Sequence, residues 1–150
     1  MRQFIIGIAF TALSLAVFAQ QDQEADSILP QLQKTLIEQA QAVALVEVTH
    51  VNSLINRALS FPGMLSVEGY SYQLSPYRQW KGHTRVGEEL RIDLKDCARS
   101  LQKGEKYIVM MSFDGEEWTS KQCEQVVAIT EAQQVLAYLD SAYGVRLAQQ

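Results

Sequence analysis

The stretch that decides the fold is Tyr70–Cys123, which reads YSYQLSPYRQWKGHTRVGEELRIDLKDCARSLQKGEKYIVMMSFDGEEWTSKQC. Glycine and proline turns divide it into short segments of β-strand character. Residues 89–94 alternate apolar with polar side chains, which predicts a strand with one buried face. Residues 107–113 are nearly all apolar, which predicts a central strand. Asp114-Gly115 then predicts a hairpin into a strand that ends at Cys123.

Two further strands are expected before Lys81. Residues 42–51 are rich in valine and open with Ala-Val-Ala-Leu, which predicts a strand buried on both faces at its start. Residues 64–79 predict a long, bent strand. Gly69 is expected at a bulge, and Pro76 at an edge or kink, because proline cannot donate to a strand ladder.

A helix is expected on each side of the strands. The first follows Ser27, a candidate cap, and tolerates Pro30 in its first turn. Its apolar positions recur at spacings of three and four: Leu29, Leu32, Leu36, Ala40 and Val43.

The second helix is expected to start at Thr130, with Gln133 completing a capping box, and to end at Gly144. Its expected apolar face is Ala132, Val135, Leu136 and Leu139. The order helix, five strands, helix predicts a mainly β domain built as a small barrel.

The amino terminus reads as a secretory signal peptide. A basic start at Arg2 precedes the apolar run Phe4–Phe18, and Val17 and Ala19 suit the positions before a cleavage site. Cleavage is expected before Gln20, which gives a secreted or periplasmic protein with no stable membrane insertion. The alternative is an uncleaved anchor, but the chain turns polar at once after Ala19. The expected organisation is 1–19 signal peptide, 20–41 polar segment and helix, and 42–150 barrel with the closing helix.

Charge disfavours nucleic acid as a partner. The whole chain carries 13 Lys and Arg against 17 Asp and Glu, and removal of the signal peptide takes away Arg2. An acidic chain repels phosphate backbones unless its basic groups cluster, and only residues 81–85 and 103–106 come near that.

Two cysteines in an exported chain most simply pair with each other, so Cys97 and Cys123 are expected to form a structural disulfide. A reactive or metal-binding pair is the alternative, but no histidine lies near either cysteine in the sequence.

The chain resembles the netrin-like domains, the fold of the tissue inhibitors of metalloproteinases and their bacterial relatives. The matching pieces are Ala44-Leu45-Val46-Glu47-Val48, Tyr72-Gln73-Leu74, Trp80-Lys81-Gly82, Leu90-Arg91-Ile92 before Cys97, Gly104-Glu105-Lys106-Tyr107-Ile108-Val109, and Cys123 ahead of a closing helix. The resemblance implies a five-stranded OB-like Greek-key barrel with flanking helices and a disulfide near one barrel end. The inhibitors chelate zinc through an amino-terminal cysteine. Here the expected terminus is Gln20, so that activity is not carried over.

The sequence predicts no enzyme, no metal site and no cofactor. The histidines are His50 and His83, in unrelated segments, and the chain has neither a Gly-x-Ser-x-Gly elbow nor a glycine-rich phosphate loop. Several carboxylates could supply a pair or a calcium site, but outward strand positions and a hairpin tip explain them more simply. They are Asp93, Asp96, Asp114, Glu116 and Glu117.

Two segments are candidates for binding. The first is an apolar connection at residues 52–65, carrying Leu54, Ile55, Leu59 and Phe61, which either contacts a partner or plugs one end of the barrel. The second is an aromatic set, Tyr70, Tyr72, Tyr77 and Trp80, which either forms a ligand-stacking face or belongs to the core.

The leading hypothesis is an exported, non-catalytic module that binds an unknown protein partner. The alternatives are saccharide or small-ligand binding on the aromatic strand, and protease inhibition by some other geometry.

Overall fold

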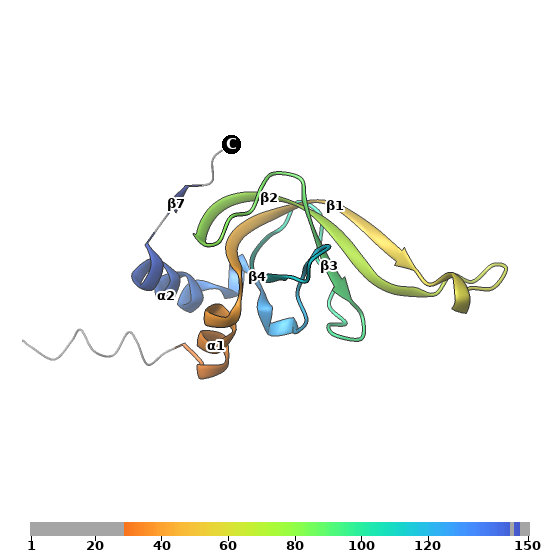
Figure 1. Cartoon of the computed structure of the whole chain (residues 1–150), viewed down its shortest axis with the longest axis horizontal. Coiled ribbons are helices and arrows are strands. Elements are labelled where there is room, and N and C mark those ends of the chain that lie inside the picture. The colour runs from red at the N-terminus through yellow and green to blue at the C-terminus, as the bar shows by residue number, and fades with distance from the viewer. Residues whose placement is uncertain (1–28, 145, 148–150) are drawn as a thin grey trace, which may run out of the picture.

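The computed structural model describes residues 29–144 and 146–147 (Figure 1). In chain order the elements are α1 (Gln31–Gln39), β1 (Ala42–Ile55), the 3₁₀ turn η2 (Arg57–Leu59), β2 (Val67–Lys81), β3 (Glu88–Asp93), β4 (Lys106–Phe113), β5 (Trp118–Thr119), η3 (Cys123–Gln125), β6 (Val126–Ala128), η4 (Ile129–Glu131), α2 (Gln133–Tyr143) and β7 (Arg146–Leu147). The expected signal peptide and the expected cap Ser27 lie outside the described residues. None of the helices in the described part is long and apolar enough to cross a bilayer.

Five strands close into an OB-like Greek-key barrel, which confirms the expected fold class. The order around the barrel is β1, β2, β3, β5 and β4, and β4 returns to pair with β1. All pairs are antiparallel except β3 with β5, which run parallel. One helix precedes the barrel in the chain and one follows it.

β5 is shorter than the sequence predicts, because the chain turns away after Thr119. The side-chain oxygen of Gln125 accepts hydrogen bonds from the backbone N–H groups of Lys121 (2.7 Å) and Gln122 (3.0 Å). These bonds hold residues 120–125 in a turn, so the prediction of one strand from Trp118 to Cys123 is wrong. The chain rejoins the edge of β4 as β6.

The start of β1 and residues 107–111 of β4 are buried on both faces, as expected for β1 from its Ala-Val-Ala-Leu opening. Ala44 and Val46 of β1 and Val109 of β4 pack inside the barrel. Val43 and Met110 face a second cluster between the barrel and the two helices. The sheet therefore supports two cores, one enclosed by the strands and one under the helices.

The first helix presents a different face from the one expected. Leu29 and Leu36 are buried, but Leu32 is 52% exposed, and Ile37 is fully buried in its place. Val43 belongs to β1, because the helix ends at Gln39. Lys81 holds this end of α1 by donating from Nζ to the backbone oxygens of Ile37 and Glu38.

The second helix buries Ala132, Val135 and Leu139 and ends at Gly144, which has a φ of 68°, as expected. Its start differs from the prediction. Residues 129–131 form η4, and α2 begins at Gln133 without a side-chain cap. The expected Thr130 capping box is therefore wrong.

β1 and β2 continue beyond the barrel as a long hairpin (Figure 1). We call residues 49–68 the arm; from Gly69 onward, β2 also pairs with β3 in the barrel wall. Beyond Glu47, β4 no longer pairs with β1, and a bulge at Thr49 marks the place where β1 leaves the barrel wall. Gly69, at the end of the β2–β3 pairing, lies where β3 passes so closely that a Cβ atom would sit 2.7 Å from the Ile92 oxygen.

Pro76 lies past the end of the β2–β3 pairing, beside a register irregularity at Tyr77. Pro76 therefore lies outside the β2–β3 ladder, which agrees with the expectation of an edge position.

Candidate functional site

The connection between β1 and β2 is shaped by hydrogen bonds within residues 56–66. The side-chain oxygen of Asn56 accepts from the N–H groups of Ala58 (3.1 Å) and Leu59 (3.2 Å). The Ser60 hydroxyl donates to the Asn56 backbone oxygen at 2.7 Å and accepts from the Ser66 N–H at 3.0 Å. Side chains thus satisfy backbone groups that the turn leaves without partners, and the connection has a defined shape.

A tight turn forms the end of the connection. Phe61 and Met64 exchange two backbone hydrogen bonds of 2.9 Å each. Pro62 and Gly63 lie between them, and Gly63 has a φ of 82°. Proline followed by glycine with positive φ is the signature of a type II turn. The side chains of Phe61 and Met64, which flank this turn, are exposed.

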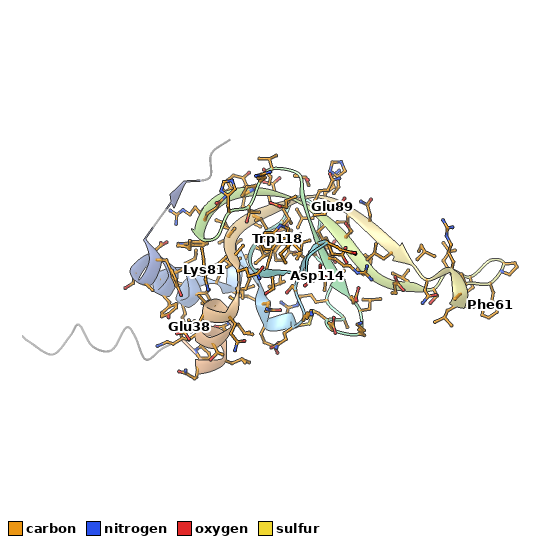
Figure 2. The ribbon with its side chains drawn as sticks, viewed as in Figure 1. Glu38, Phe61, Lys81, Glu89, Asp114 and Trp118 are labelled. Atoms are coloured by element: carbon orange, nitrogen blue, oxygen red, sulfur yellow. A yellow bond between two sulfur atoms is a disulfide. The ribbon has the colours of Figure 1, made fainter. Side chains whose placement is uncertain are left out.

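Four large apolar side chains are exposed on this connection, and we call them the apolar tip. They are Leu59 (62% exposed), Phe61 (67%), Met64 (68%) and Leu65 (71%). Figure 2 shows Phe61 at the far end of the arm, distant from Trp118 in the barrel. The expectation that this segment plugs the barrel is therefore wrong. Exposed apolar side chains gathered at one place mark interaction sites more often than scattered ones do.

The arm also corrects the expected boundaries of the connection. Residues 52–55 belong to β1, and Leu54 and Ile55 are half-buried within that strand. Met64 and Leu65, expected at the start of the next strand, belong to the tip because β2 begins only at Val67. The Pro62-Gly63 pair is the signal that identifies the turn and its flanking residues.

Charge is nearly absent from this surface. Between Val48 and Val67 the sequence has one fully charged side chain, Arg57, together with His50 and no carboxylate. The tip therefore suits an apolar partner surface and carries no group suited to chemical catalysis.

The aromatic side chains of β2 do not form one face. Tyr72 is fully buried inside the barrel, and its hydroxyl accepts from the Leu101 N–H at 3.1 Å. Trp80 is 3% exposed in the cluster under the helices. Of the two alternatives, the core assignment holds for Tyr72 and Trp80, whose rings belong to two separate cores, so the four residues do not form one ligand-stacking face.

The remaining two rings have partners of their own. Tyr70 is half-buried and packs on Tyr72, with ring centroids 6.1 Å apart. Tyr77 is 44% exposed, donates to Glu47 at 2.6 Å and lies under the ammonium of Lys106. The bond to Glu47 raises the pKa of the Tyr77 hydroxyl.

A charged groove of about 320 Å³ lies beside β3 and the β4–β5 turn. It gathers four of the five candidate carboxylates with three cations, and its charged lining residues are Arg91, Asp93, Lys95, Asp96, Asp114, Glu117 and Lys121. Arg91 donates to Asp93 at 2.7 Å and to Glu117 at 3.2 Å. The groove is therefore a network of compensated charges.

Two carboxylates of this groove, Asp93 and Asp114, have a lowered pKa. Burial acts to raise the pKa of Asp93, but the hydrogen bond and charge of Arg91, with Lys95, outweigh it and lower the pKa. The backbone N–H groups of Glu117 and Glu116 lower the pKa of Asp114. Carboxylates in such surroundings are poor general bases.

The groups that could support a metal or a nucleophile lie apart. His50 is exposed on the arm and His83 in the turn after β2. Among residues 29–144 and 146–147, no cluster of three or more His, Cys, Asp or Glu side chains could hold a metal ion.

The predicted disulfide is confirmed. Cys97 and Cys123 are bonded, with their Cα atoms 4.9 Å apart, and Cys97 is 4% exposed against the barrel core. The bond joins the chain after β3 to the turn before β6. It packs in the same cluster as Tyr72 and so supports the barrel core.

Comparison of the chain with models of known protein families gives no match. Comparison with curated proteins gives no significant match either.

Proposed function

We propose that this chain is an exported, non-catalytic binding module that holds a protein partner through the apolar tip of its arm. One observation carries the proposal: four large apolar side chains, each more than 60% exposed, stand on a turn fixed by its own hydrogen bonds. A preformed turn loses little conformational freedom on binding, so burial of these side chains contributes more fully to affinity.

The shape of the arm favours a concave partner surface. The tip is convex and lies at the end of a long hairpin (Figure 2), so it fits a groove or pocket better than a flat face. Because Arg57 is the one charged residue in the sequence from Thr49 to Val67, a carboxylate at the rim of that pocket would complement the tip.

The remaining parts of the proposal have separate support. Export to the cell exterior or periplasm is supported by the sequence of residues 1–19 and by the Cys97–Cys123 bond. A non-catalytic role is supported by the compensated charges of the groove beside β3. A distant relation to the netrin-like domains is supported by the barrel order and by the disulfide, and it remains part of the proposal.

The experiment uses protein from Gln20 onward, its disulfide confirmed by mass, to capture envelope proteins from the source organism. The captured protein is then purified and its affinity measured by calorimetry. Leu59→Asp/Phe61→Asp should weaken binding at least about 30-fold, since loss of a central apolar contact commonly costs 2 kcal/mol or more. The matched control is Val86→Asp, at an exposed apolar side chain (63%) away from the arm.

Two outcomes would contradict the proposal. A partner that binds the tip double variant as tightly as the parent would remove the tip from the function. Flotation of the parent with phosphatidylethanolamine–phosphatidylglycerol vesicles, lost in the double variant, would assign the tip to a lipid surface instead. Thermal unfolding checks that the variants are folded, which is expected because both altered side chains are exposed.

A further inference from the structure

β1 has a free edge along the arm. Its other edge pairs with β2 as far as Ile55, but β4 pairs with it only up to Glu47. At Val48 the free side is still occupied, because Val48 donates to the Glu105 oxygen and accepts from the Gly104 N–H. Beyond Val48, within residues 29–144 and 146–147, no strand pairs with this edge.

The backbone groups that point outward can be identified from the neighbouring strands. In β2, the backbone oxygens of Glu68 and Leu74 accept hydrogen bonds from the β3 side. Because backbone groups alternate in direction along a strand, the odd-numbered residues between them direct their N–H and C=O groups toward β1. Ser71 and Gln73 therefore bond with their partners Asn52 and His50. The alternate residues of β1, Val51 and Ser53, direct their N–H and C=O groups away from β2.

This edge lacks the devices that protect strand edges. Natural edge strands carry lysine, other charges or proline, or are covered by another segment. From His50 to Ile55 the sequence is His-Val-Asn-Ser-Leu-Ile, with no Lys, Arg, Asp, Glu or Pro, and residues 50–53 are all exposed. A strand of this composition is open to pairing with another strand.

We propose that the edge pairs with the same edge of a second copy of the chain, in an antiparallel, two-fold arrangement centred on Asn52. This inference goes beyond the proposed function and concerns a different surface of the arm. With the axis at Asn52, Val51 of one copy faces Ser53 of the other, and the two pairs exchange four backbone hydrogen bonds. The β3-β2-β1 sheet then continues into the partner's β1-β2-β3.

Charge favours a second copy as the occupant. In a two-fold pairing, any charged residue near the axis lies close to its own like charge, and the absence of Asp, Glu, Lys and Arg from residues 50–55 removes this repulsion. The two barrels lie on opposite sides of the axis, because β1 enters the arm from the barrel at its amino-terminal end. The strands meet where the molecule is neutral.

The test is the mass of the disulfide-bonded protein from Gln20 onward, measured by sedimentation velocity from micromolar to millimolar concentration. A dimer is expected. Ser53→Pro removes only an outward-facing N–H and should raise the dimer dissociation constant at least about tenfold, since proline is tolerated where the N–H faces away from the sheet. Leu59→Asp/Phe61→Asp should leave the dimer unchanged.

Asn52→Cys gives a second measurement that does not depend on the proline variant. Facing side chains at a two-fold axis lie about 5 Å apart at Cβ, so oxidation should link two copies through residue 52. Val86→Cys, exposed elsewhere, should link far less, and mass spectrometry should show the Cys97–Cys123 bond intact in both.

A monomer at every concentration would overturn the inference and leave partner binding by the tip standing. A dimer that survives Ser53→Pro and is not linked by Asn52→Cys would also overturn it. A dimer lost in the tip double variant but kept in Ser53→Pro would move the contact to the apolar tip. If the chain is monomeric and Ser53→Pro no longer binds the captured protein partner, the edge pairs with a strand of that partner instead.

Discussion

Trp80 on β2 donates its indole N–H to a carboxylate oxygen of Asp140 on α2, at 2.7 Å. Trp80 is almost fully buried, so this bond satisfies a polar group within the cluster that joins the barrel to the helices. Asp140→Ala leaves the indole N–H without its acceptor and should lower the free energy of unfolding by about 1–3 kcal/mol, measured in urea. Asp140→Asn keeps an acceptor oxygen and should cost less. Equal stability of the alanine variant and the parent would contradict this account.

Alanine substitutions at Gly69 and Gly87 should destabilise the protein for two different reasons, steric crowding at Gly69 and backbone strain at Gly87. At Gly69 a Cβ atom would meet two backbone atoms of β3, the Ile92 oxygen at 2.7 Å and the Asp93 Cα at 3.0 Å. Gly69→Ala should therefore cost about 2 kcal/mol or more, because neither neighbour can move without parting β2 from β3. Gly87 has a φ of 81° but open space around it, so Gly87→Ala should cost about 1 kcal/mol. Chemical denaturation of both variants checks the order, and a reversed order would contradict it.

The Cys97–Cys123 bond closes a loop with a sequence separation of 26 residues. In the chain-entropy model, a cross-link of this length stabilises the folded state by roughly 3 kcal/mol. Cys97→Ala/Cys123→Ala should lose about this amount, and a reducing agent should lower the thermal midpoint of the parent. The double variant should not respond to the reducing agent, which makes it the control. An unchanged midpoint in the reduced parent would contradict the prediction.

The Asp93 carboxylate predicts a specific pH dependence. Its pKa is lowered in the folded state by Arg91 and Lys95, so the unfolded chain binds a proton more readily. The resulting stabilisation is fully present above the ordinary carboxyl pKa of about 4 and is lost as the pH falls through the lowered value. The stability difference between the parent and Asp93→Asn should therefore be largest near neutral pH and shrink in acid. A difference that grows on acidification would contradict the assignment.

Strand patterns in the sequence predict the barrel well because the two faces of each strand meet different surroundings. The alternation of Leu90 and Ile92 and the apolar run of β4 follow directly from burial inside the barrel and under the helices. The helix faces are less predictable. Leu32 and Ile37 both fit an apolar stripe, and only the position of α1 on the barrel decides that Ile37 is buried.

The candidate site was predicted in composition but not in shape. The apolar content of residues 52–65 is evident in the sequence. The sequence does not show, however, whether those apolar side chains are buried or exposed. The hydrogen bonds of Asn56 and Ser60 decide the outcome, since they hold the turn at the end of the arm. The aromatic spacing of Tyr72 and Trp80 was misleading because bulges in β2 place them in different cores.

The bonds that shape the arm's connection join residues 56–66 to one another and none to the barrel. The conformation of this segment therefore depends on its own sequence rather than on contacts with the barrel. Under the proposed function, exchanging it for another connection of similar ends should change what the arm binds and leave the stability of the barrel unchanged. Binding by the tip and folding of the barrel would then change independently of each other, and grafting residues 56–66 onto an unrelated hairpin should transfer the apolar surface without the barrel.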